Sequence, residues 1–210
     1  YVEGITRITP LDIKYGRELG YDIKLLAIAK EEEDGILVRV HPAFIPQNHP
    51  LAAVSGVYNG VFVRGDAVDD LMFYGRGAGQ MPTASAVVGD LMEIVRNIQR
   101  NDTGRLTCTC YEEKSVIPTS SHRAKFYIRM LAKDRPGVLA GIAGVMGNHE
   151  VSLATVLQKD TYNGFAHLVF ITHEVQESNL RDALTVLNGM SIVGAVENVI
   201  RLEGVKDYGE

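Results

Sequence analysis

The segment Lys133-Asp134-Arg135-Pro136-Gly137-Val138-Leu139 has the residue types of a turn that joins a strand to a helix. Pro136 presets the first helical turn, and Gly137 places no side chain over it. Free backbone N–H groups then point outward with the positive end of the helix dipole behind them, which suits a carboxylate. Asp134 can receive the ammonium group of the same ligand, so one short turn would hold both charged ends of an amino acid.

A purely structural role for this turn stays open. Asp134 can serve only as the helix cap, and Gly137 can serve only to let the helix pack closely against its neighbours. The residue chemistry alone favours this structural interpretation over ligand binding.

A second segment, residues 74–86, offers bare backbone because Gly75, Gly77 and Gly79 precede an expected helix start. Such a loop suits an anion or the flat face of a cofactor. It lacks the Lys-Ser or Lys-Thr of a P-loop, and it is not the dinucleotide fingerprint of a parallel βαβ unit. Taken alone, the loop is better explained as a structural turn between a sheet and a helix.

The histidines and cysteines do not form a pattern typical of a metal site or a nucleophile. His41 and His49 flank prolines without carboxylate or cysteine neighbours, so we expect structural roles, with lining of a substrate cleft as the alternative. Cys108 and Cys110 are too close for an easy disulfide within a strand and too few for a four-ligand metal site, so we expect reduced thiols. Surface or sheet positions are expected for His122, His149, His167 and His173.

Composition excludes several classes of protein. The 210 residues are 46% hydrophobic and 22% charged, with a net charge of −5 and no basic stripe, so neither nucleic acid nor an anionic membrane is an expected partner. No apolar run approaches the roughly 18 residues of a membrane span, and no signal peptide opens the chain, so a cytoplasmic location is expected. The first residue is Tyr1, from which we expect a fragment or a processed product.

The first half of the chain has the pattern of a mixed α and β domain. Thr9 followed by Pro10 predicts a short helix that ends at Gly20. Apolar residues at helical spacing predict the longest helix between residues 82 and 100. Strands are predicted at residues 22–29, 36–40, 58–64 and 71–74. Residues 105–123 are predicted to form a linker that can contribute an edge strand.

The second half alternates strands and helices in the order βαββαβ. Strands are predicted at residues 125–133, 151–159, 165–172 and 196–202, and helices at 137–148 and around residues 180–187. This order indicates a ferredoxin-like unit with helices on one face of an antiparallel sheet. The fold class is therefore α+β, a mixed-sheet domain with helices on one face followed by the βαββαβ domain.

The turn at residues 133–139, followed by Gly147-Asn148 and Val151-Ser152-Leu153, resembles the ACT domain, a regulatory module that binds amino acids. The resemblance implies pairing of two copies, with ligand held between the turn of one copy and a strand of its neighbour. It also leaves open a domain that serves only in assembly. The implied ligand contacts are Asp134, Gly137, Val138, Asn148, Val151 and Ser152.

The first half resembles, segment by segment and in order, the later half of the catalytic domain of homoserine dehydrogenase. The matching segments are residues 20–27, 40–42, 45–46, 49–52, 56–61 and 75–86. The resemblance implies a division into residues 1–118, from the catalytic and dimerisation domain, and residues 119–210, the ACT domain. It also implies a homo-oligomer, expected to be a dimer, formed through sheet and ACT pairing.

The same resemblance implies an oxidoreductase that interconverts aspartate semialdehyde and homoserine with NADP or NAD, on the path to threonine and methionine. We assign no catalytic residue, because Asp22 and Lys24 lack the family's Gly-x-Asp-x-x-x-Lys spacing. The residues implied to close the nicotinamide end of the cleft are Asn59, Gly77, Ala78, Gly79 and Thr83. Without a Rossmann domain we expect this chain to be inactive and to bind no cofactor tightly.

The regulatory ligand implied by the pathway is threonine or another small aliphatic amino acid. The alternative is a stand-alone ACT-type sensor or oligomerisation module without enzymatic function. The two hypotheses differ in what the coding region upstream of Tyr1 should contain: a Gly-x-Gly-x-x-Gly turn between strand and helix for the enzyme, or a start codon for the sensor.

Overall fold

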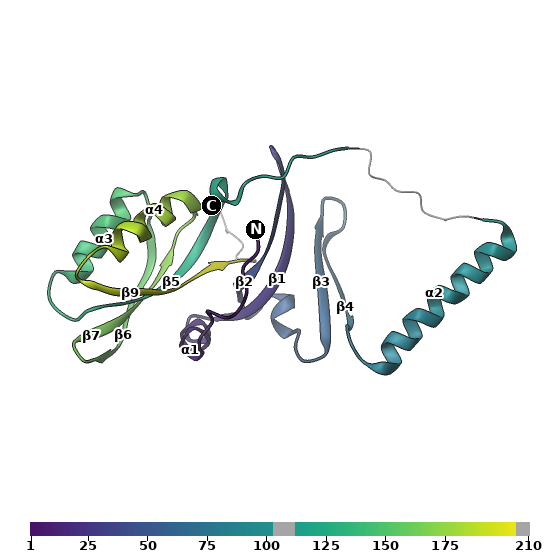
Figure 1. The fold of residues 1–210 in the computed structure, drawn as a ribbon, viewed down its shortest axis with the longest axis horizontal. Helices are drawn as coiled ribbons and strands as arrows, with labels where there is room; N and C mark the ends of the chain where they lie inside the picture. The colour runs from purple at the N-terminus through teal and green to yellow at the C-terminus, as the bar shows by residue number, and fades with distance from the viewer. Residues whose placement is uncertain (103–111, 205–210) are drawn as a thin grey trace. The chain divides into compact units, whose positions relative to one another are not determined.

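The computed structural model describes residues 1–102 and 112–204. Cys108 and Cys110 lie outside the described residues. The chain divides into two compact units, Tyr1–Gln47 together with Lys114–Glu210, and Asn48–Glu113 (Figure 1).

A seven-stranded mixed sheet organises the first unit, with strand order β1-β2-β9-β5-β7-β6 and β8 paired to β5. Its strands are β1 (Tyr21–Glu32), β2 (Gly35–Pro46), β5 (Arg123–Lys133), β6 (Leu153–Tyr162), β7 (Phe165–Thr172), β8 (Val175–Gln176) and β9 (Val193–Leu202). Its helices are α1 (Pro10–Glu18), η2 (Thr119–Ser121), α3 (Val138–Asn148) and α4 (Glu177–Asn188).

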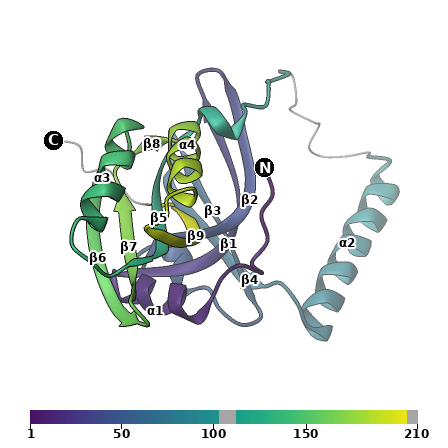
Figure 2. The same ribbon diagram turned by 60° about the vertical axis from the view of Figure 1, so that its left-hand side comes forward.

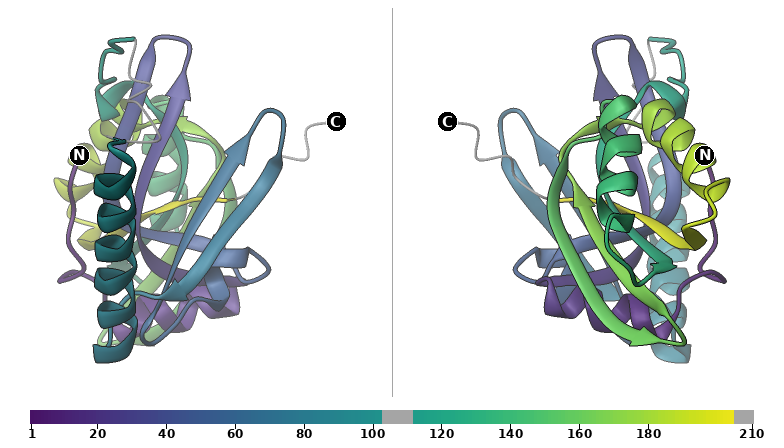
Figure 3. Two further views of the ribbon diagram at one scale, coloured as in Figure 1. Left: turned by 90° about the vertical axis from the view of Figure 1, so that its right-hand side faces the viewer. Right: turned by 90° about the vertical axis from the view of Figure 1, so that its left-hand side faces the viewer.

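The expected βαββαβ unit is confirmed as β5-α3-β6-β7-α4-β9, with α3 and α4 in front of the strands in the right-hand view of Figure 3. Alternate residues of β5 point toward these helices and form one core with them, because successive side chains of a strand face opposite sides. The fully buried members of this core include Phe126, Ile128, Met130, Ile142, Met146 and Leu187.

The other face of the same sheet is covered by the N-terminal segment, which the sequence did not indicate. Tyr127 and Ile200 on the sheet share a second core with Tyr15 of α1 and Phe44 of β2. Strand β2 also pairs with β9 in parallel, with Phe44 opposite Leu202 (Figure 2). The first compact unit therefore contains residues from both sides of the predicted domain boundary between residues 118 and 119.

Local sequence signals account for where several elements begin and turn. Helix α1 starts with a capping box, in which the Thr9 hydroxyl accepts from the Asp12 N–H and the Asp12 carboxylate accepts from the Thr9 N–H. Strands β6 and β7 join through Asn163 and Gly164, both at positive φ (50° and 76°), as a two-residue hairpin requires. Strands β1 and β2 are longer than predicted and are joined by a turn at Glu33 and Asp34.

The second unit contains η1 (Pro50–Ala53), β3 (Tyr58–Gly65), β4 (Asp69–Arg76) and α2 (Gln80–Arg100). Strands β3 and β4 form an antiparallel hairpin. Leu51 and Val54 lie so close to Gly60 that a Cβ there would meet both at 3.0 Å, so η1 covers one side of the hairpin. The predicted long helix is confirmed as α2, yet none of its residues is buried.

The predicted linker is partly described. Val116 forms an isolated bridge with Ile36, which agrees with the expected contribution of an edge pairing, and η2 follows it. Residues 105–111 of the predicted linker lie outside the described residues.

Candidate functional site

The turn between β5 and α3 leaves the start of the helix open, as the sequence predicts. Gly137 is the N-cap of α3 at φ 86°, and no side chain bonds to the first turn. A Cβ placed on Gly137 would meet nothing within 4 Å. The Val138 N–H donates to Arg135 O at 3.4 Å, so the following N–H groups of the first turn, with the dipole of the 11-residue helix behind them, are available to an anion at this point.

Asp134 does not cap α3, which removes one of the two roles expected for it. Its carboxylate accepts hydrogen bonds from Gln158 Nε2 and Thr161 Oγ1, both at 3.1 Å, and its N–H donates to Gly164 O at 2.9 Å. The carboxylate is thus held toward β6, while the side chain remains exposed.

The six predicted ligand contacts fall at two ends of α3. Asp134, Gly137 and Val138 lie at its start, whereas Asn148, Val151 and Ser152 lie at or beyond its end, roughly 15 Å away for 11 residues. The side chains of Val138 and Val151 are only 4% and 3% exposed and belong to the core, so only their backbone can face a ligand. One copy of the chain therefore does not bring the six residues together. In the expected arrangement, the start of α3 from one copy meets the residues at the end of α3 from a second copy.

The glycine loop brings together two of the residues predicted to contact cofactor. The side chain of Asn59 lies against Gly77 so closely that a Cβ on Gly77 would overlap the Asn59 amide. Gly77 also donates its N–H to Val57 O at 3.0 Å, which fixes the loop beside β3. Only glycine fits at position 77 without moving Asn59.

The remaining loop residues lie at the start of α2. Gly79, at φ 126°, is the N-cap of α2 without a side-chain cap, and Thr83 donates its N–H to Gly79 O at 3.1 Å. The side chains of Ala78 and Thr83 are exposed. The loop therefore presents a second open helix start beside Asn59, and binding of a nicotinamide cofactor there stays a prediction.

A buried polar cluster joins α1 to strands β5 and β9, and the sequence analysis missed it. Asp12, fully buried, accepts from Arg129 Nε at 2.7 Å and from Asn198 Nδ2 at 2.8 Å. Tyr127 also donates its hydroxyl to this carboxylate, at 3.3 Å. Arg129 is 2% exposed and forms a second ion pair with Glu197.

Burial alone would raise the pKa of Asp12, but hydrogen bonds from Arg129, Asn198 and Thr9 outweigh it and hold that pKa below its usual range. The carboxylate is therefore charged in the folded protein at neutral pH and neutralises the buried guanidinium. Burial also raises the pKa of Tyr127, so its hydroxyl stays a donor.

A second buried charge cluster ties β2, β9 and α4 together. Arg201 donates to Glu177 at 2.6 and 3.0 Å, and Arg39 donates to Glu203 at 2.5 Å. His41 is buried beside them, and burial lowers its pKa, which fits the structural role expected for it. Burial likewise lowers the pKa of His122 to about 4.

Within residues 1–102 and 112–204, no three His, Cys, Asp or Glu side chains gather closely enough to share a metal ion. In the same residues, no helix combines the length and the apolar character needed to cross a membrane.

Family models match two parts of the chain. The model described as homoserine dehydrogenase matches residues 1–92, and that described as the ACT domain matches residues 126–190. These two matches include the glycine loop and the turn before α3, respectively.

Curated relatives match along nearly the whole chain. It is 43% identical to the homoserine dehydrogenase of Synechocystis over 209 residues, which are 95% of this chain and 48% of that protein. It is 37% identical to that of Bacillus subtilis over 205 residues, 97% of this chain and 47% of that protein. The chain thus spans about half the length of these relatives.

Solved structures agree with this extent. The crystal structure of a homoserine dehydrogenase from Thiobacillus denitrificans matches with a TM-score of 0.85 at 36% identity, over 96% of this chain and 47% of that one. A Staphylococcus aureus homoserine dehydrogenase matches with a TM-score of 0.63 at 26% identity, over 97% of this chain and 47% of that one.

Proposed function

The chain belongs to the homoserine dehydrogenase family, and we propose that it acts as the assembly and regulatory half of an enzyme that interconverts aspartate semialdehyde and homoserine with NADP or NAD. The observation that carries this proposal is the continuous sheet of the first unit. Strand β2, from the segment that matches homoserine dehydrogenase, pairs directly with β9, the last strand of the βαββαβ unit whose residues 126–190 match the ACT domain. A change in the ACT domain can therefore reach the enzyme segment through backbone pairing and shared cores.

We retain residues 1–118 and 119–210 as the parts contributed by the catalytic and ACT domains. The ACT domain supports binding of a small-molecule amino acid, and we propose threonine as that ligand, at residues 134–138. The open N-terminus of α3 and the space above Gly137 support recognition of a carboxylate. The exposed carboxylate of Asp134 supports recognition of the ammonium group. Coupling between such a site and the catalytic centre is typically about 1 to 3 kcal/mol.

The cofactor proposal rests on the glycine loop. Asn59 packed against Gly77, with the open start of α2 next to them, suits the role of closing the nicotinamide end of a cleft. The sequence contains no Gly-x-Gly-x-x-Gly, and the loop follows an antiparallel hairpin. We therefore propose that the dinucleotide is held elsewhere in the intact, cytoplasmic enzyme.

The proposed homo-oligomer is supported by exposed apolar surface. One face of the β3–β4 hairpin presents Val61 and Phe73, which are cross-strand partners and 60% and 65% exposed. Helix α2 presents Leu91, Ile94 and Ile98 at 55%, 52% and 73%. Contiguous apolar patches of this kind mark interaction surfaces.

The direct test is oxidation of NADPH with aspartate semialdehyde, measured on this 210-residue chain and on the intact protein. We expect turnover by the intact protein and none by the chain alone, because hydride transfer needs a bound nicotinamide. Turnover by the 210-residue chain would contradict the assignment of the dinucleotide site.

A stand-alone amino-acid sensor is the second candidate, favoured by the complete core that the ACT domain forms around α3 and α4. Reading the coding region upstream of Tyr1 separates the two. A strand, a Gly-x-Gly-x-x-Gly turn and a helix would support the enzyme, whereas a start codon would support the sensor.

A further inference from the structure

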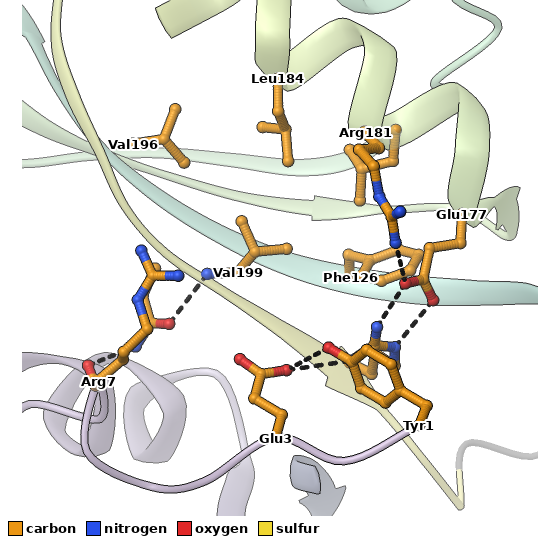
Figure 4. Close-up of a pocket in the computed structure, with 12 residues that line it drawn as sticks. Tyr1, Glu3, Arg7, Phe126, Glu177, Arg181, Leu184, Val196 and Val199 are labelled. Carbon is orange, nitrogen blue, oxygen red and sulfur yellow. Dashed lines mark hydrogen bonds and ion pairs between the residues drawn. The ribbon is translucent and has the colours of Figure 1, made fainter. Parts of the chain in front are cut away.

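A cavity of about 180 Å³ lies between α4, β9 and residues 1–7. In Figure 4, Leu184 and Arg181 descend from α4 toward β9, and Tyr1, Glu3 and Arg7 lie on the N-terminal segment across from them. The cavity lies within the first compact unit, and no residue of the turn at 134–138 lines it. It is a separate site from the effector site proposed above.

The inner wall of the cavity is aliphatic and well fixed. Helix α4 contributes Leu180 and Leu184, one turn apart on the same face, and β9 contributes Val196 and Val199. Leu180 is 2% exposed, and the other three side chains pack against the same core. About 180 Å³ is room for roughly six water molecules, which suits a short branched hydrocarbon rather than a drug-sized ligand.

The charged groups on one side of the cavity already bond to one another and hold the surrounding elements together. Glu177 accepts from Arg201 at 2.6 and 3.0 Å and from Arg181 at 3.3 Å. Arg201 and Glu177 are 5% and 6% exposed, so this pair holds α4 against β9. The Arg201–Glu177 pair therefore offers a ligand few free hydrogen-bonding groups.

The charged groups on the opposite rim can still form hydrogen bonds to a zwitterionic ligand. Glu3 Oε2 accepts from Tyr1 OH at 2.7 Å and from Arg201 Nη1 at 3.4 Å, while Glu3 Oε1 has no recorded donor among the described residues. Arg7, exposed, uses its backbone oxygen to accept from Asn198 Nδ2 at 3.1 Å, and no acceptor for its guanidinium is recorded among those residues. An anionic and a cationic group thus stand four residues apart beside an aliphatic wall.

We propose that this cavity binds a small aliphatic α-amino acid. Arg7 pairs with the ligand carboxylate, Glu3 accepts from its ammonium group, and the aliphatic side chain enters between Leu184 and Val199. Such a ligand ties the N-terminal segment to α4 and β9, and so strengthens the contact between the enzyme segment and the ACT domain. The proposal does not depend on occupancy of the turn at residues 134–138.

Titration of the 210-residue chain with L-leucine, followed by NMR of leucine and valine methyl groups, tests the site directly. We expect saturable shifts of the Leu184 and Val199 methyls, with those of Val138 and Val151, near the ends of α3, unmoved. The absence of any saturable shift would overturn the proposal. Shifts confined to Val138 and Val151 would place the ligand at the turn instead and overturn it equally.

Variants of the rim test the two charged contacts. Arg7→Gln and Glu3→Gln should each weaken L-leucine binding by about tenfold or more, since each removes a charge-assisted hydrogen bond. Arg17→Gln, on the exposed side of α1, is the matched control and should leave the affinity unchanged. 4-Methylpentanoate, which lacks the ammonium group, should bind more weakly, and Glu3→Gln should not weaken its binding further. Equal affinities for the Arg7 and Arg17 variants would refute the assigned carboxylate contact.

Discussion

Replacing Asp12 by alanine should destabilise the first unit more than any exposed charge change. The substitution leaves Arg129, 2% exposed, without the carboxylate that bonds its Nε at 2.7 Å. Removing one partner of a buried ion pair costs about 3–5 kcal/mol. We expect about 3 kcal/mol, the low end, because Glu197 still pairs with Arg129 at the partly exposed side of the cluster.

Urea unfolding followed by circular dichroism measures this loss. With a slope of about 1–3 kcal/mol per molar urea, a loss of about 3 kcal/mol should lower the midpoint by about 1–3 M. Asp22→Ala is the control, because Asp22 and Arg17 form a surface pair at 3.4 Å with side chains 29% and 68% exposed, and surface pairs contribute about 0–1 kcal/mol.

The double variant Asp12→Ala with Arg129→Met separates a buried ion pair from simple loss of packing. Once both charges are removed, no uncompensated buried charge remains, because Glu197 is partly exposed, so the double variant should be more stable than the sum of the single losses by about 1–3 kcal/mol. A loss below about 1 kcal/mol for Asp12→Ala, or strict additivity in the cycle, would refute the role given to this cluster.

Three further predictions concern the turn, the loop and the partly buried His122. Gly137 has φ 86°, so Gly137→Val should lower the free energy of unfolding in urea by about 1–2 kcal/mol. The same variant should abolish amino-acid binding at the turn, measured by calorimetry. Gly144→Ala, also at a position with open space around it, is the control and should retain binding. Gly77→Ala should raise the KM for NADPH of the intact enzyme by displacing Asn59, and Gly75→Ala, with nothing within 4 Å, should not. Because burial lowers the pKa of His122 from 6.5 to about 4, the unfolded state gains protons first, and stability should fall between pH 6.5 and 4 by up to about 3 kcal/mol. His122→Gln should flatten this slope in unfolding measured against pH, and an unchanged slope would contradict the assignment.

The alternation of strands and helices after residue 123 could be predicted because local signals there agree with the tertiary packing. The predicted bounds of β7 were confirmed at Phe165 and Thr172. The Asn163-Gly164 pair defines its hairpin by turn chemistry alone. Such signals depend on residues close in sequence.

The buried cluster could not be predicted in the same way. Arg129 interrupts an apolar strand, and a charge in that position requires a buried partner, so half of the signal was present in the sequence. The partner, Asp12, lies 117 residues away, and the capping box at the start of α1 already gives it a local role. Only the packing of α1 on the sheet shows that one carboxylate serves both purposes.

Helix α2 shows a different limit. Its 3.6-residue periodicity predicted a helix with a buried face, and the helix is confirmed, but Ile98 is 73% exposed. Periodicity identifies an apolar face without saying which surface covers it. The predicted ligand contacts show the same limit. The motif groups Val138 and Asn148, but the two residues lie at opposite ends of α3.

The regulatory role of the ACT domain is the central claim, and the most direct measurement is the rate of NADPH oxidation by the intact protein with aspartate semialdehyde at increasing threonine. The account predicts turnover that falls as threonine saturates, and a Gly137→Val enzyme that keeps its turnover but no longer responds. No turnover, or turnover in which the response to threonine survives Gly137→Val, would contradict it.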